Sequence, residues 1–210
     1  MKAPPHTNLL KTALALALAA PLFVNAESTF TTGAGSPITA SARLDFQVTV
    51  PKILFLQVGT GTAMASNATI NLITFTVPGA SLGNSTPIAA TATSGDLGNG
   101  VVTARVIGNN GNITFTSTTL GALGNGAGDT ISYAQISTTA STNTSATILA
   151  HPTLANGSTT TITLTPAAGK VINRDAKWTY SFLNQAVVPP GTYGGVNTNN
   201  GRVTYSASMP

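Results

Sequence analysis

Apolar and polar residues alternate along most of this chain, and a period of two is the pattern of a half-buried β-strand. The longest alternation runs from Ile38 to Val50, and after Pro51 it is followed by a more apolar run, Ile53–Val58. Further strands are expected over Thr69–Val77, Pro87–Thr93, Val101–Ile107, Ile113–Ser117, Ile131–Ser137, Ala146–Ala150, Thr160–Thr165, Trp178–Leu183 and Arg202–Met209. Helical periodicity is almost absent, so the pattern predicts an all-β protein.

Turn clusters rich in Gly and Asn separate these segments, and they supply the positive φ angles that tight turns need. The segment Gly108–Gly111 predicts a hairpin between its flanking strands, whereas Leu120–Asp129 and Pro166–Asp175 are expected to be loops. Many short strands punctuated in this way favour an antiparallel β-sandwich, with a β-barrel as the alternative.

The first residues have the features of a secretory signal peptide. Lys2 and Lys11 flank a polar start, an apolar run covers Thr12–Val24, and Val24-Asn25-Ala26 fits a cleavage site. An uncleaved anchor is the alternative, but the run is shorter than the roughly 20 residues that span a bilayer. We therefore expect residues 1–26 to be removed on export, residues 27–37 to form a flexible leader, and residues 38–210 to form a single β-sandwich domain with no transmembrane segment.

Composition argues against several classes of function. The chain has no cysteine, which removes thiol chemistry, thiolate metal sites and disulfides. Without Lys2 and Lys11, seven of the nine basic residues remain against five acidic ones, and they are scattered, whereas nucleic-acid-binding proteins concentrate basic residues in a patch. Disorder is the competing explanation for so many Ser, Thr and Gly residues, but 42% of the residues are hydrophobic and the alternation is regular.

Candidates for catalysis or metal binding are few. His151, which precedes Pro152, is interpreted as a surface residue of a polar loop. The acidic residues are isolated, and a Ser or Thr nucleophile would lack an activating base, so we expect no enzymatic activity, no metal site and no cofactor. Asp96 and Asn99 lie in a Gly-rich turn and leave a weak case for calcium.

The segment Ile38–Val50 could play either of two structural roles. It could be the first strand of its own sandwich, or it could leave its domain and complete the sheet of a neighbouring molecule through main-chain hydrogen bonds. In the second role its alternating apolar side chains would fill pockets along the neighbour. The candidate donor residues are Ile38, Ala40, Ala42, Leu44 and Phe46.

The two ends of the mature chain carry a further pattern. At the N-terminal end, Pro37–Asp45 precedes a proline and the buried run Ile53–Val58; at the C-terminal end, the turn Pro189–Gly195 leads into Gly201–Pro210. In these features the chain resembles the cysteine-free pilins of the chaperone–usher pathway, most closely those of colonisation-factor fimbriae. Residues Asn197–Asn200 depart from that pattern by interrupting the run into the last strand.

This resemblance implies an Ig-like domain that lacks one strand and is completed by an N-terminal donor strand. It implies that the last strand borders the acceptor groove, with Val203, Tyr205, Ala207 and Met209 along the acceptor edge. It further implies export to the periplasm, a periplasmic chaperone, an outer-membrane usher and self-association into a fimbrial polymer at the cell surface.

Two functions therefore stand at this point, ahead of a secreted enzyme, which has the least residue support. The first is a pilin-like structural subunit that assembles by donor-strand complementation. The second is a monomeric, secreted binding module that recognises a glycan or a host protein. Trp178 and Tyr180 lie on one face of a strand; core packing is the expected role, and a glycan-binding platform is the alternative.

Overall fold

The computed structural model describes residues 28–210 and divides the chain into two units between Val50 and Pro51. The predicted signal peptide, residues 1–26, lies outside the described residues. Residues 28–50 contain no helix or strand, and all of them are exposed. Within this unit the Thr29 hydroxyl donates to the carbonyl of Ser41 at 2.8 Å, and the Thr31 hydroxyl donates to the carbonyl of Thr39 at 3.2 Å.

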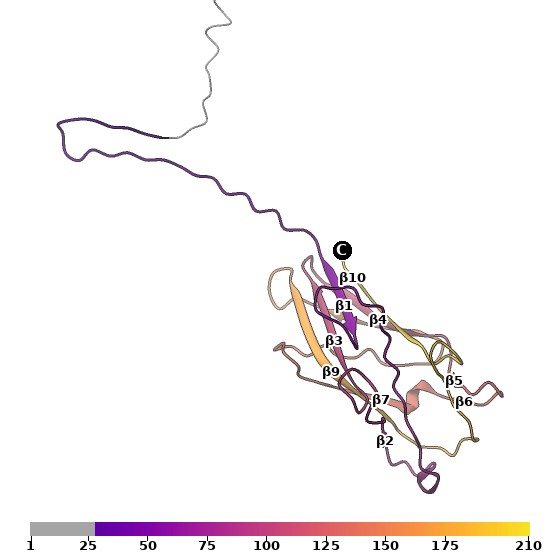
Figure 1. Ribbon diagram of the computed structural model, residues 1–210. Coiled ribbons are helices and arrows are strands. Elements are labelled where there is room, and N and C mark those ends of the chain that lie inside the picture. The colour runs from indigo at the N-terminus through magenta and orange to yellow at the C-terminus, as the bar shows by residue number, and fades with distance from the viewer. Residues whose placement is uncertain (1–27) are drawn as a thin grey trace, which may run out of the picture. The chain divides into compact units, whose positions relative to one another are not determined.

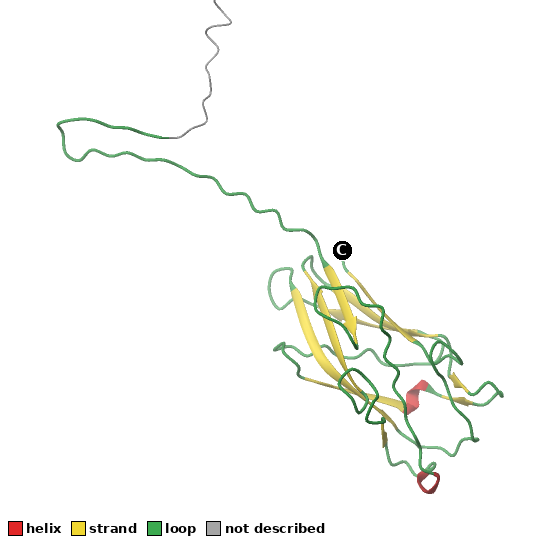
Figure 2. Cartoon of the chain, in the orientation of Figure 1, coloured by secondary structure: helices red, strands yellow, loops and turns green. Residues whose placement is uncertain are grey.

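Residues 51–210 form two antiparallel sheets that pack together (Figures 1 and 2). The larger sheet contains β1 (Leu54–Val58), β2 (Ile88–Ala89), β3 (Val101–Gly108), β7 (Ile136–Ser141) and β9 (Ile172–Phe182). The smaller sheet contains β4 (Ile113–Thr119), β8 (Thr159–Leu164) and β10 (Val203–Ser208). A two-stranded ladder joins β5 (Leu123–Gly124) to β6 (Thr130–Ile131), and the short 3-10 helices are η1 (Gly79–Ser81) and η2 (Tyr133–Gln135). Across residues 28–210, no helix has the length and apolar character needed to cross a membrane.

The order of strands follows from their pairing. In the larger sheet β1 pairs with β3, and β3 pairs with β9. Both β2 and β7 pair with Ser181 and Phe182 of β9, so these two strands occupy its opposite edges. In the smaller sheet β4 lies between β10 and β8. The prediction of an all-β antiparallel sandwich is confirmed.

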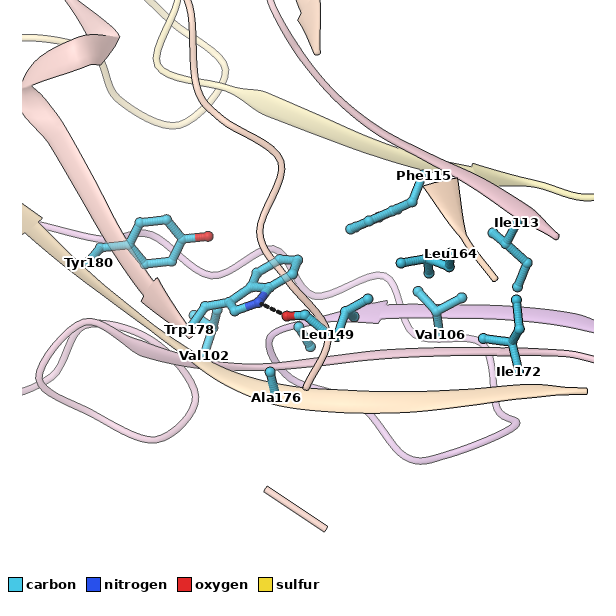
Figure 3. Close-up of a cluster of buried hydrophobic side chains, with 11 residues drawn as sticks. Val102, Val106, Ile113, Phe115, Leu149, Leu164, Ile172, Ala176, Trp178 and Tyr180 are labelled. Carbon is cyan, nitrogen blue, oxygen red and sulfur yellow. Dashed lines mark hydrogen bonds between the residues drawn. The ribbon is translucent and has the colours of Figure 1, made fainter. Parts of the chain in front are cut away.

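Alternate residues of the central strands build the core between the sheets (Figure 3). Strand β9 shows the expected period of two, since Ile172, Ala176 and Trp178 are buried on one face. Trp178 is fully buried, its ring is 6.1 Å from that of Phe115 across the sandwich, and its indole N–H donates to the carbonyl of Leu149 at 2.8 Å. The core is therefore continuous between the two sheets.

The predicted hairpin at Gly108–Gly111 is wrong. The turn connects β3 in the larger sheet to β4 in the smaller one, so the chain crosses the sandwich instead of pairing with itself. Gly111 has a φ of +102° and its amide donates to the carbonyl of Lys170, which holds the turn against the segment before β9. Turn residues predict a change of direction, but they do not specify which strand comes next to which.

Four other segments differ from the sequence predictions. Residues 69–77 form no β-ladder. The amide of Thr74 donates to the Ser94 hydroxyl, and the carbonyl of Thr74 accepts the amide of Thr91. Ile73 and Phe75 still pack against the core. Residues 146–150 contribute a single parallel bridge at Ile148. Both predicted loops contain strand residues, since β5 lies within 120–129 and β9 begins at residue 172.

Candidate strand-addition site

The outer strands of both sheets, β1, β2, β7, β8 and β10, each have one edge without a β-partner in the described part of the chain, and β1 and β10 are the two from different sheets that lie close together. In that part β1 pairs with β3 alone, and β10 pairs with β4 alone. The two strands approach each other, but no ladder joins them. An unpaired edge presents free N–H and C=O groups and can recruit an additional strand.

The free backbone groups of β10 belong to the predicted acceptor residues. The amide of Thr119 in β4 donates to Ser158 on the β8 side, at 3.1 Å. Because successive residues of an antiparallel strand turn their backbone groups to opposite sides, every second residue of β4 faces β8 and the others face β10. The register then pairs the even-numbered residues of β10 with β4. It follows that Val203, Tyr205 and Ala207 direct their backbone groups toward the free edge.

The same reasoning applies to β1. The amide of Gly59 donates to the carbonyl of Thr103 at 2.7 Å, which fixes the alternation along the β1–β3 ladder. Leu54, Leu56 and Val58 therefore turn their backbone groups away from β3. Strand β1 also lines a hollow of about 600 Å³ that is bounded on its other side by residues 64–67.

Apolar side chains along both free edges are incompletely covered. Leu56 and Val58 of β1 pack against the core but are partly exposed. On β10, Tyr205 and Ala207 do the same, and Met209, just beyond the strand, completes the row; Val203 is also half-buried. The residues of the core itself are at most 8% exposed. The structure thus places Tyr205, Ala207 and Met209 at the margin of the core, and Val203 is half-buried at the start of the same row.

The predicted donor residues alternate with polar ones and would form a separate apolar face in an extended strand. Leu44 is 75% exposed, Phe46 is 86% exposed, and Ile38, Ala40 and Ala42 are exposed as well. Large apolar side chains continue this face at Val48 and Val50. The intervening residues are polar, so the segment would present one apolar side on forming a strand. Contiguous exposed apolar surface of this kind marks an interaction site in most soluble proteins.

The interpretation of His151 as a surface residue is wrong. Its ring makes a T-shaped contact with that of Trp178, with centroids 4.6 Å apart, and its Nε2 lies 2.6 Å from the Tyr205 hydroxyl. The Tyr205 hydroxyl in turn lies 3.0 Å from that of Tyr180. Trp178 and Tyr180 are buried, which excludes a glycan-binding platform and agrees with core packing. The sequence gives no signal for this cluster, because its members come from three segments that meet only in the fold.

We expect the stability of the domain to fall between pH 6.5 and about pH 4 through His151. Burial lowers the pKa of His151 from 6.5 to about 4, and the backbone hydrogen bond at Pro152 opposes this shift. Because the unfolded chain binds the proton first, the free energy of unfolding decreases as the pH falls through this window. Denaturant unfolding of His151→Gln should show a smaller decrease over the same range than the unaltered protein. An equal decrease in both proteins would contradict this assignment.

A second polar cluster surrounds Asp175, which is 1% exposed. Its carboxylate pairs with the Arg105 guanidinium at 2.8 Å and accepts the amides of Thr144 and Ser145 at 3.0 and 2.8 Å, together with the Thr144 hydroxyl. Burial acts to raise the pKa of Asp175. The hydrogen bonds to the carboxylate lower the pKa by more than burial raises it, so the pKa lies well below its ordinary value. The carboxylate holds the segment 143–145 against β9 and has no free oxygen for catalysis.

The residues considered for calcium binding, Asp96 and Asn99, have structural roles in a turn. Asp96 accepts the amide of Thr103 at 2.9 Å, and Asn99 has a φ of +52°, which are roles in a turn. Among residues 28–210, no group of three or more His, Cys, Asp or Glu residues is placed to hold a metal ion.

Comparisons of the chain with protein-family models, with curated proteins and with solved structures found no match.

Proposed function

We propose that this protein is an exported, pilin-like structural subunit that assembles into a surface fimbria by donor-strand complementation. In this proposal Ile38–Val50 of one copy adds to the free edge of the next copy. The observation that carries the proposal is that two apolar surfaces of the chain are both exposed and could cover each other in neighbouring copies. One part of the chain has an apolar face without cover, and another part has a core margin without cover.

The chemistry of the two surfaces is complementary. A strand added beside β10 can exchange hydrogen bonds with the free backbone groups of Val203, Tyr205 and Ala207. Its alternate side chains would then lie over the half-buried core residues, because a strand places every second side chain on the same face. Burying Leu44 and Phe46 in this way would contribute about 1.5–3 kcal/mol each. Where β1 and β10 now approach each other, they would separate to about twice the spacing of neighbouring strands, roughly 9.6 Å.

Such a subunit needs protection before it assembles. A free edge and an exposed apolar strand both favour aggregation, so transient cover by a periplasmic chaperone, and ordered release through an outer-membrane usher, would suit these surfaces. The absence of cysteine fits a subunit that is held together by strand insertion instead of disulfides.

The test compares the mature chain with a variant that lacks residues 27–50, both expressed in the periplasm. We expect the mature chain to form multimers that resist SDS, and the shortened variant to be unstable until a synthetic peptide of residues 38–50 is added. A peptide in which Leu44 and Phe46 are replaced by Ser is the matched control and should not stabilise the variant. A mature chain that is a stable monomer, together with a shortened variant of equal stability, would overturn the proposal and support a monomeric binding module.

A further inference from the structure

The donor segment, residues 38–50, lies directly before β1, one of the strands with a free edge. Pro51, Lys52 and Ile53 alone separate Val50 from the start of β1. A tethered strand has an effective concentration in the millimolar range when its linker can reach the site, and near zero when it cannot. Insertion into the same molecule would therefore outcompete donation to another copy unless the connection prevents it.

Asn109 binds this connection through two side-chain hydrogen bonds. Its side-chain amide donates to the carbonyl of Pro51 at 2.8 Å, and its side-chain oxygen accepts the amide of Ile53 at 2.9 Å. Gly108, the residue before it, is the ladder partner of Leu54. Ile53 and Asn109 are thus the next pair beyond Leu54 and Gly108, and the Asn109 side chain takes the place of its backbone in this pair.

The next residue of the same turn holds the other free-edged strand. The side-chain amide of Asn110 donates to the carbonyl of Pro210, just beyond β10, at 2.6 Å. The turn itself is anchored by the hydrogen bond from Gly111 to Lys170. Two adjacent asparagines thus hold the start of β1 and the end of the chain, but Asn109 alone of this pair bonds to the donor's connection.

Insertion beside β1 in the same molecule requires the chain to reverse direction within Pro51–Ile53. A reversal there would reorient the Pro51 carbonyl and the Ile53 amide, and both are the groups that Asn109 binds. We propose that Asn109 is a positioning residue that opposes self-complementation and so directs Ile38–Val50 to another copy of this chain. This inference rests on the proposed function.

The test replaces Asn109 in the full mature chain at a fixed protein concentration. Asn109→Ala removes both hydrogen bonds, and the ratio of folded monomer to multimer should rise about tenfold. Asn109→Asp keeps the acceptor for Ile53 but loses the donor to Pro51, so a smaller rise is expected. Asn125→Ala is the control: it removes hydrogen bonds of an asparagine within the loop 125–129, outside β1 and β10, and should leave the ratio unchanged.

Trypsin cleavage after Arg43 reports where the donor lies, because this residue is within the exposed segment. The additional monomer formed by Asn109→Ala should resist cleavage at Arg43, as expected of a strand inserted into its own domain. If Asn109→Ala and Asn109→Asp give the same ratio as Asn125→Ala, the inference is wrong while the proposed function stands. If the unaltered chain is a monomer that is cut rapidly at Arg43, the proposed function fails and the inference fails with it. Should Asn109→Ala not fold, Asn109→Asp decides between these outcomes.

Discussion

Replacing Leu44 by Asp should abolish assembly. In the proposed assembly Leu44 lies over the core of the neighbouring copy, and it is 75% exposed in the free segment, so the change costs the isolated subunit little. In the assembled state it removes about 1.5–3 kcal/mol of apolar burial and adds a carboxylate without a partner. A loss of about 3 kcal/mol or more corresponds to at least a hundredfold weaker association. Size-exclusion chromatography and SDS gels of unheated samples measure the effect.

The control for this prediction lies on the opposite face of the same segment. Gln47→Asp introduces the same charge three residues away, at a polar position of the alternation. It should leave multimers intact, because odd-numbered residues of the donor would face solvent. Intact multimers with Leu44→Asp, or loss of multimers with both variants, would contradict strand insertion with this face inward.

Asp175→Ala should cost the domain about 3–5 kcal/mol, the range found when one partner of a buried ion pair is removed. The change leaves the Arg105 guanidinium and the amides of Thr144 and Ser145 without their acceptor. Segment 143–145 should then detach from β9. Denaturant unfolding at neutral pH, with hydrogen exchange of residues 143–145, measures both effects.

The same carboxylate predicts a pH dependence in strongly acidic solution. The pKa of Asp175 is lowered in the folded state, so its contribution is complete above the ordinary pKa of an aspartate and is lost as the pH falls below about 4. This window lies below that of His151, so the two groups can be separated by titration. Asp129→Ala is the matched control, since Asp129 lies in a loop, and it should cost less than about 1 kcal/mol. An unfolding free energy of Asp175→Ala equal to that of the control would contradict this role.

Local alternation predicted the class of fold and most strands, because the period of two records which side chains face the core. It failed at the start of β9, which includes Asn173 and Asp175 and was expected to belong to the loop Pro166–Asp175. These residues lie on the outer face of the strand, and the segment 143–145 buries Asp175 from that side. When a loop distant in the sequence buries the outer face of a strand, the sequence of the strand itself shows no periodic pattern that reports it.

The candidate site was predictable in part for the same reason. The alternation of Val203, Tyr205 and Ala207 indicates which side chains share a face, and that face is the one that points to the core. Which edges stay unpaired is a property of long-range pairing, and no local pattern reports it. The connection held by Asn109 was missed because its turn was interpreted as a hairpin, whereas its side chains bind segments far away in the sequence.

Cysteine cross-linking tests the central claim most directly, because the chain has no cysteine of its own. One population would carry Ala207→Cys on β10, and a second would carry a single cysteine at one position from 40 to 48. Two cysteines bond when their Cα atoms lie about 4.4–6.8 Å apart and their side chains share a face. The account predicts disulfides between different copies at one or two even-numbered donor positions and at none of the odd-numbered ones. Equal cross-linking at even and odd positions, or no cross-linking between copies at any position, would contradict it.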